Sequence, residues 1–98
     1  MYIPEYHRFF KKDIERDRKS GKFSADDFTL LKEVMSTLLD SKTLDEKHKN
    51  HSLKGGWEGA YECHVKNDWL LIYQISGDST TMTFIRLGTH AQIFKKFK

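Results

Sequence analysis

A run of nearly uninterrupted apolar residues, Trp69–Ile75, constrains the fold of this chain more than any other segment. Turn-forming pairs bound the run on both sides, Asn67-Asp68 before it and Gly77-Asp78 after it. A short apolar run between two turns is typical of a strand that is buried on both faces. The segment therefore predicts the central strand of a sheet, with a neighbouring strand on each side.

The flanking segments supply those neighbours. Residues 59–66 alternate between an apolar set, Tyr61, Cys63 and Val65, and a polar set, Glu62, His64 and Lys66. This alternation predicts a half-buried strand with one polar face, because successive side chains of a strand point to opposite faces. Residues 80–87 are rich in Thr, Ile and Phe, which favour strands. Short turns between the segments predict an antiparallel meander.

The N-terminal half has helical periodicity instead. After a short strand expected at Tyr2-Ile3, apolar residues recur at helical spacing over residues 5–20, with Pro4 expected at the helix start. Gly21 is expected to end this helix, because glycine adopts the left-handed conformation at little cost.

A second helix is predicted to begin after the N-cap Ser24 and to end at about Asp40, and it carries a broad apolar stripe. Two helices joined by a short turn form a helical hairpin. Thr89 is expected to cap a short C-terminal helix. The predicted fold class is therefore α+β, a helical hairpin packed on a small, mainly antiparallel sheet.

Length and composition limit the alternatives. The chain has 98 residues, which predicts a single domain spanning residues 1–98. Apolar residues make up 38% and charged residues 32%, as in globular domains. The sequence contains neither an apolar run long enough to cross a membrane nor a secretory signal, so we expect a cytoplasmic protein. Cys63 is the only cysteine, and we expect it to be a buried strand residue.

Basic residues are concentrated in two regions. The segment from Arg8 to Lys22 carries an excess of Lys and Arg, and every charged residue after Asp78 is basic. The formal net charge is only +3. Such patches suit a polyanion or an acidic protein partner, although the first segment is equally consistent with a solvated helix face.

Histidines and one aspartate gather in the second half of the chain. His51, His64, Asp68 and His90 fall close together, with Arg86 among them. Histidine both accepts and donates a proton near neutral pH. Several histidines beside a carboxylate and an arginine therefore indicate general acid–base chemistry on an anionic substrate, for which RNA is the obvious candidate.

RNA cleavage needs a base for the 2′-hydroxyl, an acid for the leaving 5′-oxygen and a cation near the phosphate. Histidines can serve as base and acid, Arg86 can stabilise the phosphate, and Asp68 can orient a histidine. Trp69 and Phe94 are candidates for stacking on bases, although core packing is the other interpretation of Phe94. A metal site is the alternative interpretation of the histidines, but HxH, HExxH and CxxC spacings are absent.

The segment from His51 to Phe94 resembles the YafQ-like branch of the RelE/ParE toxin superfamily. HSLKGGW matches the pattern H-x-L-x-G-x-W, HVKNDW matches H-(V/I)-x-x-D-W, and RLGTHAQIF matches R-x-G-(T/S)-H-x-x-(L/I)-F. The segment that carries these motifs covers almost half of the chain, and the order of elements agrees over nearly all of it.

This resemblance implies a RelE-like fold and a ribosome-dependent mRNA endoribonuclease that works without a metal or other cofactor. The catalytic residues that it implies are His51, His64, Asp68, Arg86 and His90. RNA contacts are expected from Lys54, Trp69 and Phe94. The resemblance does not decide which histidine is the acid and which is the base.

The implied partners are a cognate antitoxin and a ribosome with mRNA in its A site, with no membrane partner. Operator DNA would be bound only through the antitoxin complex. Two other functions stay open at this point: a ParE-like toxin that binds a topoisomerase, and an inert module that only binds an antitoxin. Neither of these needs the histidines.

Overall fold

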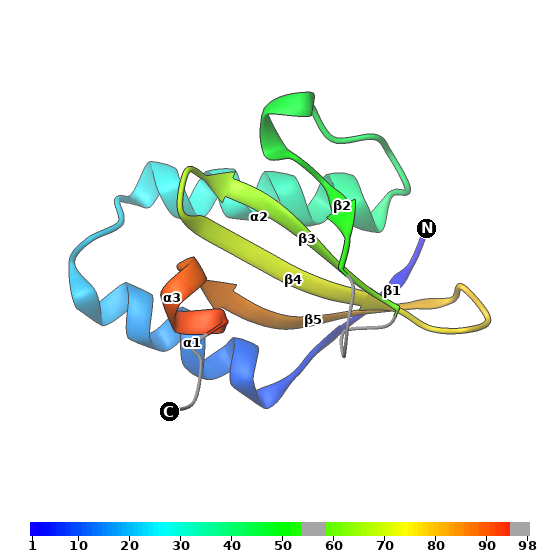
Figure 1. The fold of residues 1–98 in the computed structure, drawn as a ribbon, viewed down its shortest axis with the longest axis horizontal. Coiled ribbons are helices and arrows are strands. Elements are labelled where there is room, and N and C mark those ends of the chain that lie inside the picture. The colour runs from blue at the N-terminus through cyan, green and yellow to red at the C-terminus, as the bar shows by residue number, and fades with distance from the viewer. Residues whose placement is uncertain (54–58, 95–98) are drawn as a thin grey trace.

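The computed structural model describes residues 1–53 and 59–94, which form a five-stranded sheet with helices on both faces (Figure 1). None of the helices in these ranges is long and apolar enough to span a bilayer. In chain order the elements are β1 (Ile3–Tyr6), α1 (Arg8–Ser20), α2 (Ala25–Leu39), the 3-10 helix η1 (Glu46–His48), β2 (His51–Ser52), β3 (Ala60–Lys66), β4 (Trp69–Ile75), β5 (Thr81–Gly88) and α3 (His90–Ile93).

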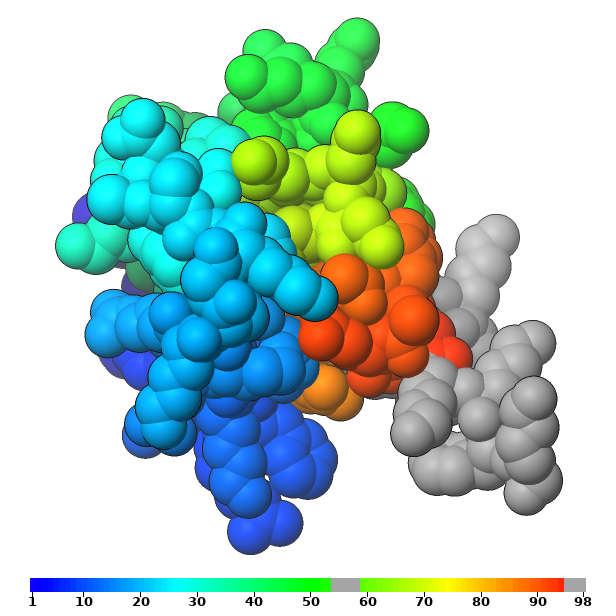
Figure 2. All heavy atoms as spheres, turned by 90° about the vertical axis from the view of Figure 1, so that its left-hand side faces the viewer, coloured from blue at the N-terminus to red at the C-terminus, as the bar shows by residue number. Residues whose placement is uncertain are grey.

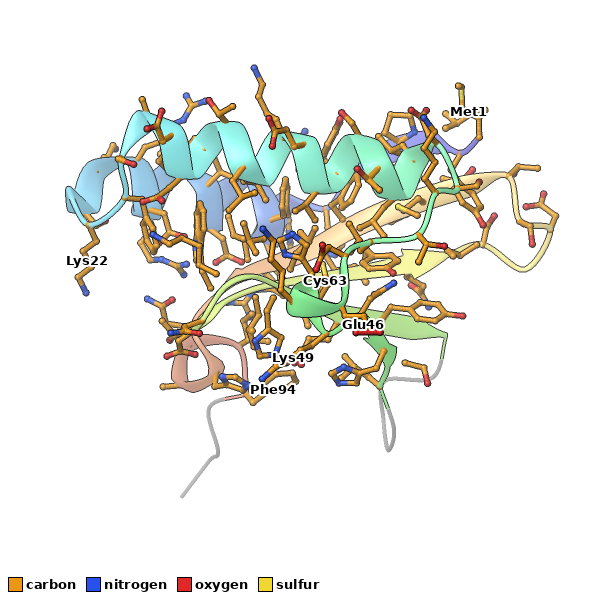
Figure 3. The ribbon with its side chains drawn as sticks, turned by 90° about the horizontal axis from the view of Figure 1, so that it is seen from above. Met1, Lys22, Glu46, Lys49, Cys63 and Phe94 are labelled. Atoms are coloured by element: carbon orange, nitrogen blue, oxygen red, sulfur yellow. The ribbon has the colours of Figure 1, made fainter. Side chains whose placement is uncertain are left out.

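The sheet has the strand order β1-β5-β4-β3-β2, so the apolar strand β4 lies at its centre, as predicted. β3, β4 and β5 form an antiparallel meander, β2 pairs antiparallel with β3, and β1 pairs parallel with β5. Helices α1 and α2 cover one face, and the short helix α3 lies on the other (Figure 3). The predicted α+β class with a helical hairpin and a mainly antiparallel sheet is thus confirmed.

The start of the chain differs from the prediction. Pro4 lies in the strand β1 rather than in a helix, and α1 begins only at Arg8, after the N-cap His7. The Ile3 N–H donates to the Thr80 carbonyl oxygen at 2.8 Å, so the next residue along the strand, Pro4, faces away from β5. Because β1 is an edge strand, a residue without an N–H is tolerated at that position.

The ends of the hairpin helices match the sequence signals. Gly21 ends α1 with a φ of 74°, the left-handed conformation that favours glycine. Ser24 caps α2 in a reciprocal pair: its hydroxyl accepts from the Asp27 N–H at 3.1 Å, and the Asp27 carboxylate accepts from the Ser24 N–H at 2.9 Å. The predicted second helix and its boundaries are confirmed.

The main core lies between the sheet and the two long helices, and Trp69 is part of it. Its side chain is only 1% exposed. The indole stacks on Phe23 with ring centroids 4.1 Å apart, meets Phe28 edge-on, and donates from Nε1 to the Asp17 carboxylate at 2.8 Å. The expectation that Trp69 stacks on RNA bases is therefore wrong for this conformation, because neither ring face is open to a ligand.

Cys63 lies in the same core and is fully buried. Burial raises the pKa of its thiol to about 12, so the reactive thiolate is scarcely populated near neutral pH. The expectation of a buried structural cysteine is confirmed.

A smaller apolar cluster forms on the opposite face of the sheet. Its buried members are Ala60, Leu70, Ile72 and Ile93. Ile93 belongs to α3, and its burial anchors that helix over β4. The helix in turn carries His90 at its first position, so this cluster sets where His90 lies relative to the sheet.

Candidate active site

The first element of the site is the contact between α3 and the β3–β4 turn. Figure 2 shows the two segments side by side, the turn in yellow-green and α3 in orange-red. Asp68, in the turn, accepts from the His90 backbone N–H at 2.9 Å and contacts His90 Nδ1 at 2.7 Å. These hydrogen bonds, the backbone one first, lower the pKa of the Asp68 carboxyl below its usual value, so the carboxylate is ionised at neutral pH.

An ionised carboxylate only accepts hydrogen bonds, so His90 Nδ1 carries the proton in this contact. The other ring nitrogen, Nε2, is then the atom that exchanges protons. The His90 side chain is 55% exposed, which leaves it accessible to a substrate. Asp68 thus fixes the orientation and the tautomer of His90, the arrangement expected of a histidine that accepts a proton.

The second element is Glu62, which sequence reasoning did not select. Its side chain is only 7% exposed and lies between two histidines, with Oε1 at 3.4 Å from His51 Nε2 and at 3.6 Å from His64 Nε2. The alternation of β3 did place Glu62 on the polar face with His64. That pattern was the available signal, but glutamates on polar strand faces are too common to stand out.

The other nitrogens of these two histidines are occupied by backbone carbonyl oxygens. His51 Nδ1 lies 2.8 Å from the Lys49 carbonyl oxygen, and His64 Nδ1 lies 3.1 Å from that of Asn67. Because a carbonyl oxygen only accepts, both Nδ1 atoms carry protons. A further proton on either Nε2, facing Glu62, makes that imidazole cationic, and the carboxylate stabilises this form.

The two elements meet at His64 and His90. Their rings are arranged edge to face with centroids 5.7 Å apart. One ligating atom each from Glu62, His64 and His90 lies within 4.8 Å of the others. These three residues could hold a metal ion as well as exchange protons, since carboxylate oxygen and imidazole nitrogen are both ligands for zinc or copper.

Arg86 does not join this cluster through any hydrogen bond or ion pair in the described part of the chain. Its Nε donates to Asp13 at 2.7 Å and its Nη2 donates to the same carboxylate at 3.3 Å. The register between β4 and β5 is irregular at this point, where Ile72 pairs with Arg86 but Tyr73 pairs with Phe84. The ion pair with Asp13 directs Arg86 toward α1.

Phe94 and Lys54 are the other two residues that were predicted to contact RNA. Phe94 is half-buried against the smaller apolar cluster, and its ring centroid lies 6.3 Å from that of His90. The interpretations of Phe94 as packing and as a substrate contact are therefore both compatible with its position. Lys54 lies outside the described residues.

His48 is a further residue that the sequence did not single out. It is 6% exposed, and its Nδ1 lies 2.6 Å from the carbonyl oxygen of His64. This bond ties η1 to the strand that carries His64. Since a carbonyl oxygen accepts, His48 is the donor and acts as a brace rather than as an exposed proton carrier.

Comparison with known proteins shows which family the chain belongs to. Residues 2–95 match the family model of the bacterial toxin of type II toxin–antitoxin systems, YafQ. The chain belongs to the YafQ family. It is 35% identical over 91 residues to the mRNA interferase toxin YafQ of Escherichia coli K12, an alignment that covers 92% of each chain.

Solved structures of YafQ-like toxins agree in fold. The E. coli DinJ–YafQ complex contains a chain that is 34% identical, with a TM-score of 0.82 and coverage of 96% of this chain and 99% of that one. A metal-bound toxin from Helicobacter pylori is 38% identical, with a TM-score of 0.85 and coverage of 96% and 100%. The resemblance seen in the sequence motifs is confirmed over nearly the whole chain.

Proposed function

We propose that this protein is the toxin of a type II toxin–antitoxin pair and an endoribonuclease that cuts mRNA in the ribosomal A site without a catalytic metal. The observation that carries the proposal is the His90–Asp68 pair beside His64 and Glu62. Membership of the YafQ family, in which the E. coli relative is an mRNA interferase, supports it. A ribosomal site of action would place the reaction in the cytoplasm.

The proposed reaction is an internal transfer at one phosphate. The 2′-oxygen attacks the adjacent phosphorus while the bond to the 5′-oxygen breaks, which leaves a 2′,3′-cyclic phosphate and a 5′-hydroxyl. His90 Nε2 takes the 2′-hydroxyl proton, and Asp68 stabilises the imidazolium that forms. His64, in its protonated form beside Glu62, gives its Nε2 proton to the 5′-oxygen.

The other members of the set have supporting roles in this proposal. His51 approaches the same Glu62 carboxylate oxygen as His64 and shares its negative charge. Arg86 stabilises charge on the phosphate, and Nη1 is the nitrogen for this contact because Nε and Nη2 donate to Asp13. Phe94 and Lys54 contact the RNA near the cut.

An antitoxin is the proposed protein partner. The structurally similar toxin in the DinJ–YafQ complex is bound to its own antitoxin. The basic α1 suits an antitoxin that is acidic in part. In such a pair the antitoxin supplies the DNA-reading element, so operator DNA is bound only through the complex.

The direct test uses purified protein and ribosomes programmed with a defined mRNA. We expect cleavage within the A-site codon of programmed ribosomes, and far slower cleavage of the same RNA free in solution. Cleavage that is equally fast without ribosomes would contradict ribosome dependence. Growth inhibition without any RNA cleavage, together with binding to a topoisomerase, would favour the ParE-like alternative.

Replacing Asp68 with asparagine is expected to slow cleavage by about 10- to 100-fold, the range typical when a partner that orients a functional histidine is lost. Asparagine retains an oxygen that accepts from His90 but lacks the charge that stabilises its imidazolium form. The lowered pKa of Asp68 means that the carboxylate stays ionised from neutral pH down past 3.8, so its contribution is lost only in acid. Single-turnover cleavage near neutral pH, where the Asp68 carboxylate is ionised, measures the loss in the variant. A variant as fast as wild type would exclude this role for Asp68.

Added transition metals are expected to inhibit RNA cleavage rather than to support it. Because Glu62, His64 and His90 can act as ligands, added Zn²⁺ or Cu²⁺ should occupy the proton-transfer groups and inhibit cleavage. Chelation of transition metals with phenanthroline, with Mg²⁺ kept for the ribosome, should leave the rate unchanged and should reverse the inhibition. Loss of activity on chelation, restored by one added metal, would overturn the metal-independent mechanism.

A further inference from the structure

A surface pocket of about 240 Å³ lies next to the proposed active site but outside the set of residues that the reaction uses. It is bounded by η1 with the residues after it, by the end of β3 with its turn, and by α2. The residues that line it are Leu30, Lys47, His48, Lys49, His64, Val65, Lys66 and Asn67. We call it the lysine pocket. In Figure 3 the labelled Lys49 lies on the side of the sheet away from α1 and α2.

The charges around the lysine pocket are of one sign. Its charged lining residues are Lys47, Lys49 and Lys66, and it has no acidic lining residue among the described ones. Lys66 is paired with Asp27 at 2.8 Å. Within the described ranges, neither Lys47 nor Lys49 has a carboxylate within ion-pair distance, so both ammonium groups are available to an anion.

The acidic residues closest in sequence do not cancel this charge. Asp45 caps η1, and its carboxylate accepts from the Lys47 backbone N–H at 3.0 Å. Glu46, the other acid of this segment, does not line the pocket. Leu30 and Val65 add apolar surface, so the pocket offers both a charged rim and a surface on which the apolar part of a nucleotide can lie.

The lysine pocket is joined to the proposed reaction centre through His64, which takes part in both. Its ring approaches Glu62 and His90, and its carbonyl oxygen accepts from the pocket residue His48 at 2.6 Å. The pocket therefore adjoins the proposed reaction centre at His64.

We propose that the lysine pocket binds the phosphate of a nucleotide that flanks the scissile bond, with Lys47 and Lys49 as the charged contacts. This inference rests on the proposed ribonuclease function. Phosphate contacts of this kind position a nucleic acid without reading its sequence, so the pocket would hold the mRNA in register for cleavage at His64 and His90.

The test combines variants of the protein with a change in the substrate. In the protein, Lys47→Gln and Lys49→Gln are made singly and together, with Lys11→Gln/Lys12→Gln on α1 as the charge-matched control. In the mRNA, one phosphate at a time beside the A-site cut is replaced by a neutral methylphosphonate. Single-turnover cleavage on programmed ribosomes gives the toxin concentration for half-maximal rate and the maximal rate.

The double variant should raise the half-maximal concentration by roughly tenfold and leave the maximal rate within about twofold, because surface charge contacts are individually modest. A methylphosphonate at one flanking position should weaken the wild type similarly and leave the double variant unaffected, because the contact is already lost. If every methylphosphonate weakens the double variant as much as it weakens the wild type, the lysines do not contact a flanking phosphate, and the proposal is overturned. The lysines would then contact the ribosome or another partner. A wild-type protein that cuts no RNA would instead refute the underlying function.

Discussion

Replacing His90 with alanine is expected to slow cleavage of A-site mRNA by about 10²–10⁴-fold, the usual contribution of one proton-transfer group. The contact of His90 Nδ1 with Asp68 at 2.7 Å leaves Nε2 as the only nitrogen of the ring that can take the 2′-hydroxyl proton. Single-turnover cleavage on programmed ribosomes measures the effect. His7→Asn is the matched control, because His7 caps α1 far along the chain and asparagine is also a good N-cap.

His64→Ala should cause a loss of similar size, and the leaving group separates the two roles. An mRNA with sulfur in place of the bridging 5′-oxygen at the cut site has a leaving group that needs no proton. On this substrate the His64 variant should approach the wild-type rate, because only the acid has been made unnecessary. The His90 variant should stay slow.

Rescue of His90→Ala but not of His64→Ala would reverse the two assignments. If neither variant is rescued, neither residue is the general acid, and His51 becomes the candidate for that role. Equal rates for all variants on the normal substrate would refute acid–base catalysis by this cluster.

The other large expected effect concerns stability. Trp69→Ala should lower the free energy of unfolding by about 3–5 kcal/mol, as is typical for removal of a large buried aromatic ring. The alanine leaves a cavity against Phe23 and Phe28 and removes the donor to Asp17. Urea unfolding followed by circular dichroism measures the loss.

Trp69→Phe keeps an aromatic ring but removes the indole N–H, which leaves the buried Asp17 with one donor fewer at a cost of about 1–3 kcal/mol. Where this variant is folded, its RNA cleavage should be close to wild type. A stable Trp69→Phe protein with strongly weakened mRNA binding would show that Trp69 contacts RNA after all and would contradict its placement in the core.

The second helix and the central strand could be predicted from the sequence because their signals are local. Ser24 and Asp27 form a capping box within one turn, and the apolar run of β4 lies between two turns. A short strand was expected at Tyr2-Ile3, but the extent of β1 was missed because its pairing partner, β5, lies more than seventy residues away, and the periodicity of residues 5–20 suggested an early helix start.

The site could be predicted in part for the same reason. His64 and His90 were recognisable by residue type and motif, and the turn and cap that carry Asp68 and His90 are local features. Trp69 was misassigned because a continuous apolar strand does not show which side chain faces the helices. The ion pair of Arg86 with Asp13 could not be predicted because the two residues lie more than seventy positions apart, and Glu62 was missed because its importance comes from burial beside two histidines.

The measurement that tests the central claim most directly is mapping of new mRNA 5′ ends in cells that briefly express the wild-type protein or His90→Ala. The proposed function predicts new ends inside coding regions, in frame with the codons, that are absent with the His90 variant. Growth arrest by the wild type with no new ends would contradict the ribonuclease account and favour a topoisomerase target. Absence of both cuts and arrest would favour an inert antitoxin-binding module.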